Sequence, residues 1–313
     1  MTSLRPSAPR FKLSFLPFAI LSLFLAANVP LMRGAAQEPD ASPVPPPPPA
    51  VFQKTFASGQ LSFLSDYAGH PAKEALKVKR LHAILKQMIP RTEYHYGRDM
   101  PLSDASEIVL DGNSLPVEIR DGRYVTIATS GGEYLSGKGF LWFDLQQGIA
   151  LGGVFFHPTN GEPTPTLAIF SRQLKETTLS MSQLPVAFAQ DLGAWLAEAR
   201  VRPISPRYFI PDNGKKYVLV HDEDYCDSPP GAPAPPQDEC QQLNADAADA
   251  DLKAAYFMKE TGNAANATAW MLNPELVTWF GVRDQTCGLG PGAIGCRIRI
   301  TRQRTRVVIR QHS

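Results

Sequence analysis

Hydrophobic positions between residues 51 and 222 recur with two different periods, one typical of helices and one typical of strands. A first helix is predicted by four apolar residues at helical spacing, namely Leu81, Ile84, Leu85 and Met88. Pro71 suits its first turn, and Pro90 ends it. Pro185 opens a second helix, expected over about 185–200, whose inner face carries Phe188, Leu192, Trp195, Leu196 and Ala199.

Strand-like runs fill the rest of this region. They are predicted at 117–120, 124–127, 140–144, 149–156, 166–171, 207–210 and 216–221. Asp121-Gly122 favours a tight hairpin between the first two runs, because this pair accepts the positive φ angles of such a turn. Pro211-Asp212-Asn213-Gly214 indicates a second hairpin. Parallel strands require long helical crossovers between them, and the order of these helices and strands lacks such crossovers. It therefore predicts an antiparallel α+β domain over 51–222, with flanking helices.

The residues from 223 to 313 are predicted to form a small helical module. An Ala-rich stripe predicts a helix over 241–260 that ends at Gly262, with an inner face of Leu243, Ala247, Ala250, Ala254 and Phe257 or Met258. A second helix over about 275–286 would bury Leu276, Trp279 and Val282. The tail 297–310 holds six arginines and no acid, which fits a basic helix, although its alternating Arg and Ile residues also fit a strand.

The first 50 residues resemble an export leader followed by a spacer. A basic start, an uncharged stretch over 13–32 and small residues before Ala36 predict a signal peptide over 1–36. The alternative is an uncleaved membrane anchor, since about 20 apolar residues span a bilayer. A Pro-rich linker over 37–50 contains five consecutive prolines, which favour a stiff polyproline II spacer. We therefore expect a periplasmic or secreted protein that contacts membrane only if the leader is retained.

All four cysteines follow residue 225, and in an exported chain they imply two disulfides. We favour Cys226–Cys240 and Cys287–Cys296, because each pair closes a loop rich in proline or glycine. The alternative Cys240–Cys287 would form if two antiparallel helices brought these residues to the same end. Zinc is disfavoured, since neither pair has the spacing of a metal knuckle.

Charge and motifs exclude several classes of function. Lys and Arg number 31 and Asp and Glu 30, so the net charge of +1 argues against a nucleic-acid partner held by bulk charge. No Gly-rich phosphate loop, Gly-x-Ser-x-Gly elbow or His-Glu-x-x-His pair occurs in the sequence. We therefore expect no cofactor, no metal and no enzymatic activity.

Two polar segments remain as candidate sites. In the loop over 156–165, His157 and Glu162 could form an acid/base pair, while Asn160 belongs to a turn signal and three prolines favour a rigid loop. An envelope hydrolase or ligand-binding protein would need this loop to line a cleft rather than lie flat. The segment 221–224 (His-Asp-Glu-Asp) offers oxygens to a hard cation, but it lacks EF-hand spacing, and we expect solvated acids at a strand end.

Residues 226–310 resemble the lysozyme-inhibitor LprI-like domain family of bacterial envelope proteins. The first matching pattern is Cys240-x-x-Leu243-Asn244, followed by Ala248-Asp249-x-Asp251-Leu252-x-x-Ala255-Tyr256. The second is Trp279 followed by Arg283-Asp284 and Cys287, and Cys296 then opens an arginine-bearing segment. The resemblance implies a disulfide-pinned helical module outside the cytoplasm that binds lysozyme and is not an enzyme. The family's lipid-anchoring cysteine is missing, and the preceding region resembles only uncharacterised secreted bacterial proteins.

The same residues have a physical interpretation as scaffold. Trp279 is expected in the core, and Arg283 is expected to pair with helix ends or with Asp249. Because lysozymes are usually basic, an inhibitor would present acids such as Asp246, Asp249 and Asp251, or a loop, unless those acids pair with the arginines of the tail. The expected partner is therefore a lysozyme-like glycosidase or another envelope protein. As an alternative, the basic tail would bind anionic cell-wall polymer in a structural role.

Overall fold

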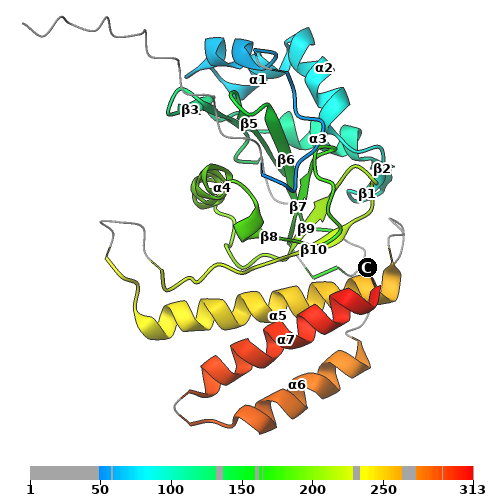
Figure 1. Cartoon of the computed structure of the whole chain (residues 1–313), viewed down its shortest axis with the longest axis vertical. Helices are drawn as coiled ribbons and strands as arrows, with labels where there is room; N and C mark the ends of the chain where they lie inside the picture. Colours follow the sequence, from blue (N-terminus) through cyan, green and yellow to red (C-terminus); the bar gives the residue numbers. More distant parts are fainter. Residues whose placement is uncertain are drawn as a thin grey trace, which may run out of the picture. The chain divides into compact units, whose positions relative to one another are not determined.

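In the computed structural model, the strands after residue 117 form one eight-stranded sheet (Figure 1). Its order is β3-β4-β5-β6-β7-β9-β10-β8. The strands are β3 (Glu118–Arg120), β4 (Tyr124–Ala128), β5 (Lys138–Asp144), β6 (Ile149–Phe156), β7 (Thr166–Phe170), β8 (Leu179–Ser180), β9 (Arg207–Ile210) and β10 (Tyr217–Val220). A separate two-stranded sheet pairs β1 (Glu93–His95) with β2 (Asp99–Pro101).

The structure describes residues 49–57, 59–131, 137–158, 162–163, 165–227, 233–262, 273–290 and 292–312. The expected signal peptide (1–36), most of the expected linker (37–50) and Asn160 lie outside them. Within these ranges, no helix is both long enough and apolar enough to cross a bilayer. Residues 45–313 belong to one compact unit, and the expected boundary at residue 222 stays a prediction.

Both predicted hairpins are confirmed. Asp121 and Gly122 adopt φ angles of 56° and 61°, and β3 pairs antiparallel with β4 across them. β9 and β10 pair antiparallel around Gly214, whose φ is 72°. Seven strands, β3 to β7, β9 and β10, thus follow the hydrophobic pattern, and the α+β class with a mainly antiparallel sheet and flanking helices is confirmed.

One expectation about topology is wrong, because a helical crossover is present. β7 and β9 pair in parallel, with Leu167 opposite Arg207 and Phe170 opposite Ile210. The chain returns between them through η2 (Met181–Gln183) and α4 (Val186–Glu198), so β7, α4 and β9 form a β-α-β unit. β8 also pairs in parallel with β10.

Helices cover both faces of the sheet. The elements η1 (Ser62–Tyr67), α1 (Ala72–Leu76), α2 (Lys79–Met88) and α3 (Leu102–Leu110) share a core with Leu141 and Phe143 of β5. On the other face, α4 shares a second core with Phe140 and Trp142. These β5 residues alternate between the two cores, which is why the strand reads as a continuous apolar run. The predicted first helix forms two separate helices, because Pro71 is the N-cap of α1 and Val78 is the N-cap of α2.

Asp191 fixes α4 on the sheet. Its carboxylate accepts hydrogen bonds from Trp142 Nε1 at 2.7 Å and from Arg120 Nε at 2.7 Å. Trp195, one turn further along the helix, donates from Nε1 to the Thr129 carbonyl at 3.0 Å. The inner face predicted for this helix is confirmed, since all five of its residues are buried.

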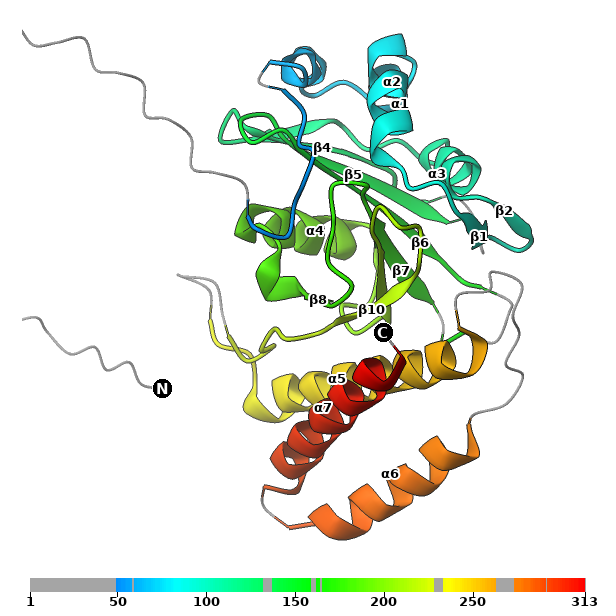
Figure 2. The ribbon, with the colours of Figure 1, turned by 45° about the vertical axis from the view of Figure 1, so that its right-hand side comes forward.

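Three helices follow the sheet, α5 (Gln237–Thr261), α6 (Pro274–Cys287) and α7 (Ala293–His312). α5 and α7 lie side by side, and α6 packs against α7 (Figure 2). A third core joins Leu252, Ala255 and Tyr256 of α5 to Tyr208 and Val218 of the sheet. The tail after Cys296 is therefore a helix and not a strand.

Both favoured disulfides are present. Cys226–Cys240 links the segment after β10 to the start of α5, and Cys287–Cys296 links the end of α6 to the start of α7.

Gly262 ends α5 with a φ of 62°, as predicted. Val282, predicted inside, is 56% exposed, because α6 buries Leu276 and Arg283 instead.

Candidate functional site

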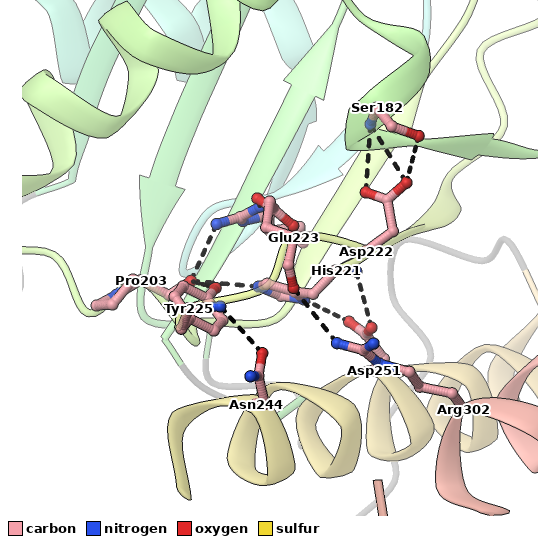
Figure 3. A network of polar contacts seen from close by, with 10 residues as sticks. Ser182, Pro203, His221, Asp222, Glu223, Tyr225, Asn244, Asp251 and Arg302 are labelled. Carbon is pink, nitrogen blue, oxygen red and sulfur yellow. Dashed lines mark hydrogen bonds and ion pairs between the residues drawn. The ribbon is translucent and has the colours of Figure 1, made fainter. Parts of the chain in front are cut away.

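A buried ion pair joins the end of β10 to α5 and lies at the centre of a polar network (Figure 3). The side chains of His221 and Asp251 are 0% and 1% exposed. His221 Nδ1 lies 2.6 Å from Asp251 Oδ1, and the backbone N–H of His221 donates to Oδ2 at 2.8 Å. One carboxylate therefore holds both the side chain and the backbone of His221.

The second ring nitrogen of His221 is also engaged. Nε2 lies 3.2 Å from the carbonyl oxygen of Pro203. A carbonyl can only accept, so Nε2 carries a proton, and Nδ1 faces a carboxylate. Neither nitrogen has a free lone pair directed at a substrate or a metal. His221 therefore has a structural place here and is not a general base.

Pro203 accepts two further hydrogen bonds on the same carbonyl. Arg207 donates from Nη2 at 3.0 Å, and Tyr225 donates from its hydroxyl at 3.1 Å. Arg207 comes from β9 and is 4% exposed. Its Nη1 lies 2.5 Å from Glu223 Oε1, so the guanidinium bridges the Pro203 carbonyl and the Glu223 carboxylate. Burial raises the pKa of Tyr225 to about 12, which keeps this hydroxyl a donor at neutral pH.

Replacing Glu223 by glutamine is expected to flatten the acid side of the stability profile. Burial raises the pKa of Glu223, but the charge and hydrogen bond of Arg207 outweigh burial and leave the pKa below its ordinary value of 4.5. Stabilisation by this carboxylate is thus complete above the ordinary value and is lost as the pH falls through the lowered pKa. Urea midpoints measured from about pH 7 to about pH 3 should fall less steeply for Glu223→Gln. Identical slopes for the two proteins would contradict the assignment.

Asp222 and Asp224 are exposed, as expected of acids at a strand end, and both also accept hydrogen bonds from protein donors, whereas Glu223 is partly buried. Asp222 accepts from the backbone N–H of Ser182 at 3.2 Å and from its hydroxyl. Asp224 Oδ1 accepts from the N–H of Cys226 at 2.9 Å and from Asn244 Nδ2 at 2.7 Å. In the described ranges, no group of three His, Cys, Asp or Glu residues is placed to hold a metal ion.

Two described residues of the loop over 156–165, Pro163 and Pro165, line a groove. His157 is exposed at the end of β6, whereas Glu162 is buried and paired with Lys216 Nζ. The Lys216 ammonium also lies 4.8 Å from the ring centroid of Tyr208. Pro163 and Pro165 border a groove of about 370 Å³, whose other lining residues include Asp246, Asp249 and Lys253 of α5.

Arg283 holds the three C-terminal helices together. Its Nη1 lies 2.5 Å from Asp249 Oδ1 of α5 and 3.2 Å from the Thr301 hydroxyl of α7. Its Nε donates to Asp284 at 2.9 Å. Burial raises the pKa of Asp249, and the charge of Arg283 opposes that rise. The predicted Arg283–Asp249 pair is present, and it is part of the scaffold.

Two expectations about the acids of α5 need correction. Asp251, expected at the surface, is buried against His221 because α5 is covered by the sheet as well as by α7. The ion pairs found for the arginines of α7 are with acids of α6, namely Arg297 with Asp284 at 3.4 Å and Arg304 with Glu275. Trp279, expected in the core, is only partly buried beside it.

No sequence pattern marks Arg207, Pro203 or Tyr225 as part of a polar site. The available signal was an arginine that opens the otherwise apolar strand over 207–210. Such a charge at a buried strand position requires a partner, which Glu223 supplies sixteen residues later. Comparison with known proteins finds no match to this chain among family models, curated proteins or solved structures.

Proposed function

We propose that this chain is an exported cell-envelope protein whose C-terminal module binds a basic protein partner, with a lysozyme-like glycosidase as the first candidate. The observation that supports it is an acidic segment. Between residues 222 and 252 the chain has no Lys or Arg and nine acids, which are Asp222, Glu223, Asp224, Asp227, Asp238, Glu239, Asp246, Asp249 and Asp251. A charge of one sign on a rigid element steers an oppositely charged partner.

Five of these acids form what we call the acidic surface. They are exposed and lie on either side of the Cys226–Cys240 disulfide, whose Cα atoms are 5.0 Å apart: Asp222, Asp224, Asp227, Asp238 and Glu239. Asp222 and Asp224 are held in place by the hydrogen bonds to Ser182 and Asn244. The disulfide brings the two halves of the surface together, so part of the ordering cost is met before a partner arrives.

Export is supported by the leader-like composition of residues 1–36 and by the two disulfides, which persist in oxidising compartments. The resemblance to the LprI-like family supports the partner class. The residues that carry this resemblance serve the scaffold, since Asn244, Asp251 and Arg283 are buried and hydrogen-bonded. We therefore assign partner binding to the acidic surface.

The test is binding and inhibition of a panel of lysozymes by the oxidised protein at low and high salt. We expect binding that weakens as salt rises, because charge drives the association. Neutralising the acidic surface by Asp→Asn and Glu→Gln should weaken affinity at least about tenfold. Amide side chains keep the acceptors that hold Asp222 and Asp224 in place.

A matched control separates the acidic surface from net charge. It neutralises five exposed acids of the preceding region, namely Asp66, Asp104, Glu107, Glu118 and Glu198. The control should bind like the unchanged protein. An equal loss of affinity in the two variants would contradict the proposal. So would the absence of binding and inhibition at large molar excess.

A structural role on anionic cell-wall polymer is a second candidate, and one observation favours it. Arg299, Arg306 and Arg310 are exposed on α7, and their spacing places them on one side of the helix. Sedimentation with purified cell wall that is abolished by salt and by Arg→Gln changes at these positions would favour this role. A hydrolase has weaker support, because Glu162 is buried against the Lys216 ammonium.

A further inference from the structure

A small cavity of about 240 Å³ lies between α4 and the polar network. Its apolar wall is formed mainly by Met181, Leu192, Leu196 and Val201. Its polar end is formed by Pro203, Arg207, Glu223 and Tyr225, three of which Figure 3 labels. An apolar cavity with a few converging polar groups is the usual form of a small-molecule site.

One polar atom at this end lacks a partner. Glu223 Oε1 pairs with Arg207; the side chain as a whole is 34% exposed, but its Oε2 atom is buried, and no hydrogen-bond donor of another residue within the described ranges reaches that atom. The lowered pKa of Glu223 means that this oxygen carries negative charge at neutral pH. A buried, charged acceptor without a donor is costly, so a ligand that donates a hydrogen bond to Oε2 would be stabilised there.

A larger cavity of about 660 Å³ between α2 and α3 lacks this feature. Its buried hydroxyl, on Ser106, already donates to the Leu102 carbonyl at 2.7 Å. His82, Glu93 and Glu107 on its walls are exposed to solvent. The unmet acceptor therefore distinguishes the smaller cavity.

The charges around the cavity indicate the class of ligand. Arg207 with Glu223 and His221 with Asp251 form two neutral pairs, so the polar end has no excess charge. A cation there would be repelled by the Arg207 guanidinium, and an anion by the Glu223 carboxylate. The donors of Arg207 and Tyr225 already bind the Pro203 carbonyl. We propose that the cavity binds a small neutral molecule with an apolar body and a hydroxyl group that donates to Glu223 Oε2.

The test uses 4-methylphenol and toluene, which share an apolar ring and differ chiefly in the hydroxyl. Binding to the full chain would be followed by amide NMR shifts of α4 and of the 203–225 segment. We expect 4-methylphenol to bind about tenfold to a hundredfold more tightly than toluene, since a hydrogen bond to a charged group is among the stronger ones. Glu223→Gln should reduce the preference for 4-methylphenol over toluene, because it removes the charged acceptor. Tyr225→Phe should leave this preference unchanged, because it leaves that acceptor in place.

A blocking variant tests the location. Gly193 lines the cavity, and a Cβ built on it meets no atom within 4 Å. It is an exposed position inside α4 without a positive φ, so Gly193→Leu adds helix propensity and bulk at the edge of the cavity, with no clash at its Cβ. We expect this variant to melt no lower than the unchanged protein and to lose binding of both probes.

Three results would overturn the proposal. One is that neither probe binds up to its solubility, which would mean that solvent alone satisfies Glu223. The second is equal affinity for 4-methylphenol and toluene in the unchanged protein. The third is binding that survives in a folded Gly193→Leu protein. None of these results bears on the acidic surface, so this proposal and the proposed function can fail separately.

Discussion

Asp251→Ala is expected to lower the free energy of unfolding by about 3–5 kcal/mol, as observed when one member of a buried ion pair is removed. The change leaves the buried His221 ring with Nδ1 facing no acceptor, and it also removes the acceptor of the His221 backbone N–H. The urea concentration at the midpoint of unfolding should therefore fall. The slope of the unfolding free energy against urea concentration should change proportionally less. His221→Ala should destabilise the fold comparably, because it leaves the carboxylate unpaired.

The matched control is Asp246→Ala, five residues earlier on the same helix. Asp246 is half-buried, and Gln242 Nε2 donates to it at 2.7 Å. Its loss should change stability by less than about 1 kcal/mol. A double variant with leucine at 221 and 251 should recover part of the loss, since an apolar pair carries no unpaired charge. Equal small effects at 246 and 251 would mean that the buried pair contributes little.

The sheet was predictable because its strands carry local signals. The run over 149–156 is continuous and apolar, and the structure forms β6 over the same residues. Asp121-Gly122 fixes a hairpin through backbone preferences that do not depend on distant residues. Burial by helices on both faces then explains why β5 lacks the polar alternation of a half-exposed strand.

Topology was less accessible, because it depends on which strands meet. The helix over 185–200 was predicted, but nothing in its own sequence shows that the flanking strands pair in parallel across it. The same limit applies to α5. Its Ala-rich stripe indicates one buried face, whereas the sheet and the segment that follows β10 cover further residues, among them Asp251 and Asn244.

The polar network was the least predictable part. His221 looked like the end of a strand followed by solvated acids, yet its partner lies thirty residues later on a helix. Arg207 and Glu223 are sixteen residues apart, and Pro203 contributes only its backbone carbonyl. Every residue has a backbone carbonyl, so residue type does not identify such an acceptor. A cluster of this kind can therefore be recognised only in the folded structure.

Removing the Cys226–Cys240 disulfide by serine substitution is expected to cost about 3 kcal/mol, from the entropy of closing a loop of this length. Cys287→Ser with Cys296→Ser should cost about 2.5 kcal/mol, because the sequence separation is 9 rather than 14. Urea unfolding of the two double variants would measure these costs. The two variants are therefore matched in stability.

They should differ in partner binding. The first disulfide joins Asp222, Asp224 and Asp227 to the acids at the start of α5, so its loss frees one half of the acidic surface. The second joins α6 to α7 and leaves that surface untouched. Affinity for a lysozyme should thus fall several-fold only in the Cys226/Cys240 variant, because flexible carboxylates must be ordered on binding. A similar fall in both variants would show that global stability, and not the arrangement of the acidic surface, controls binding.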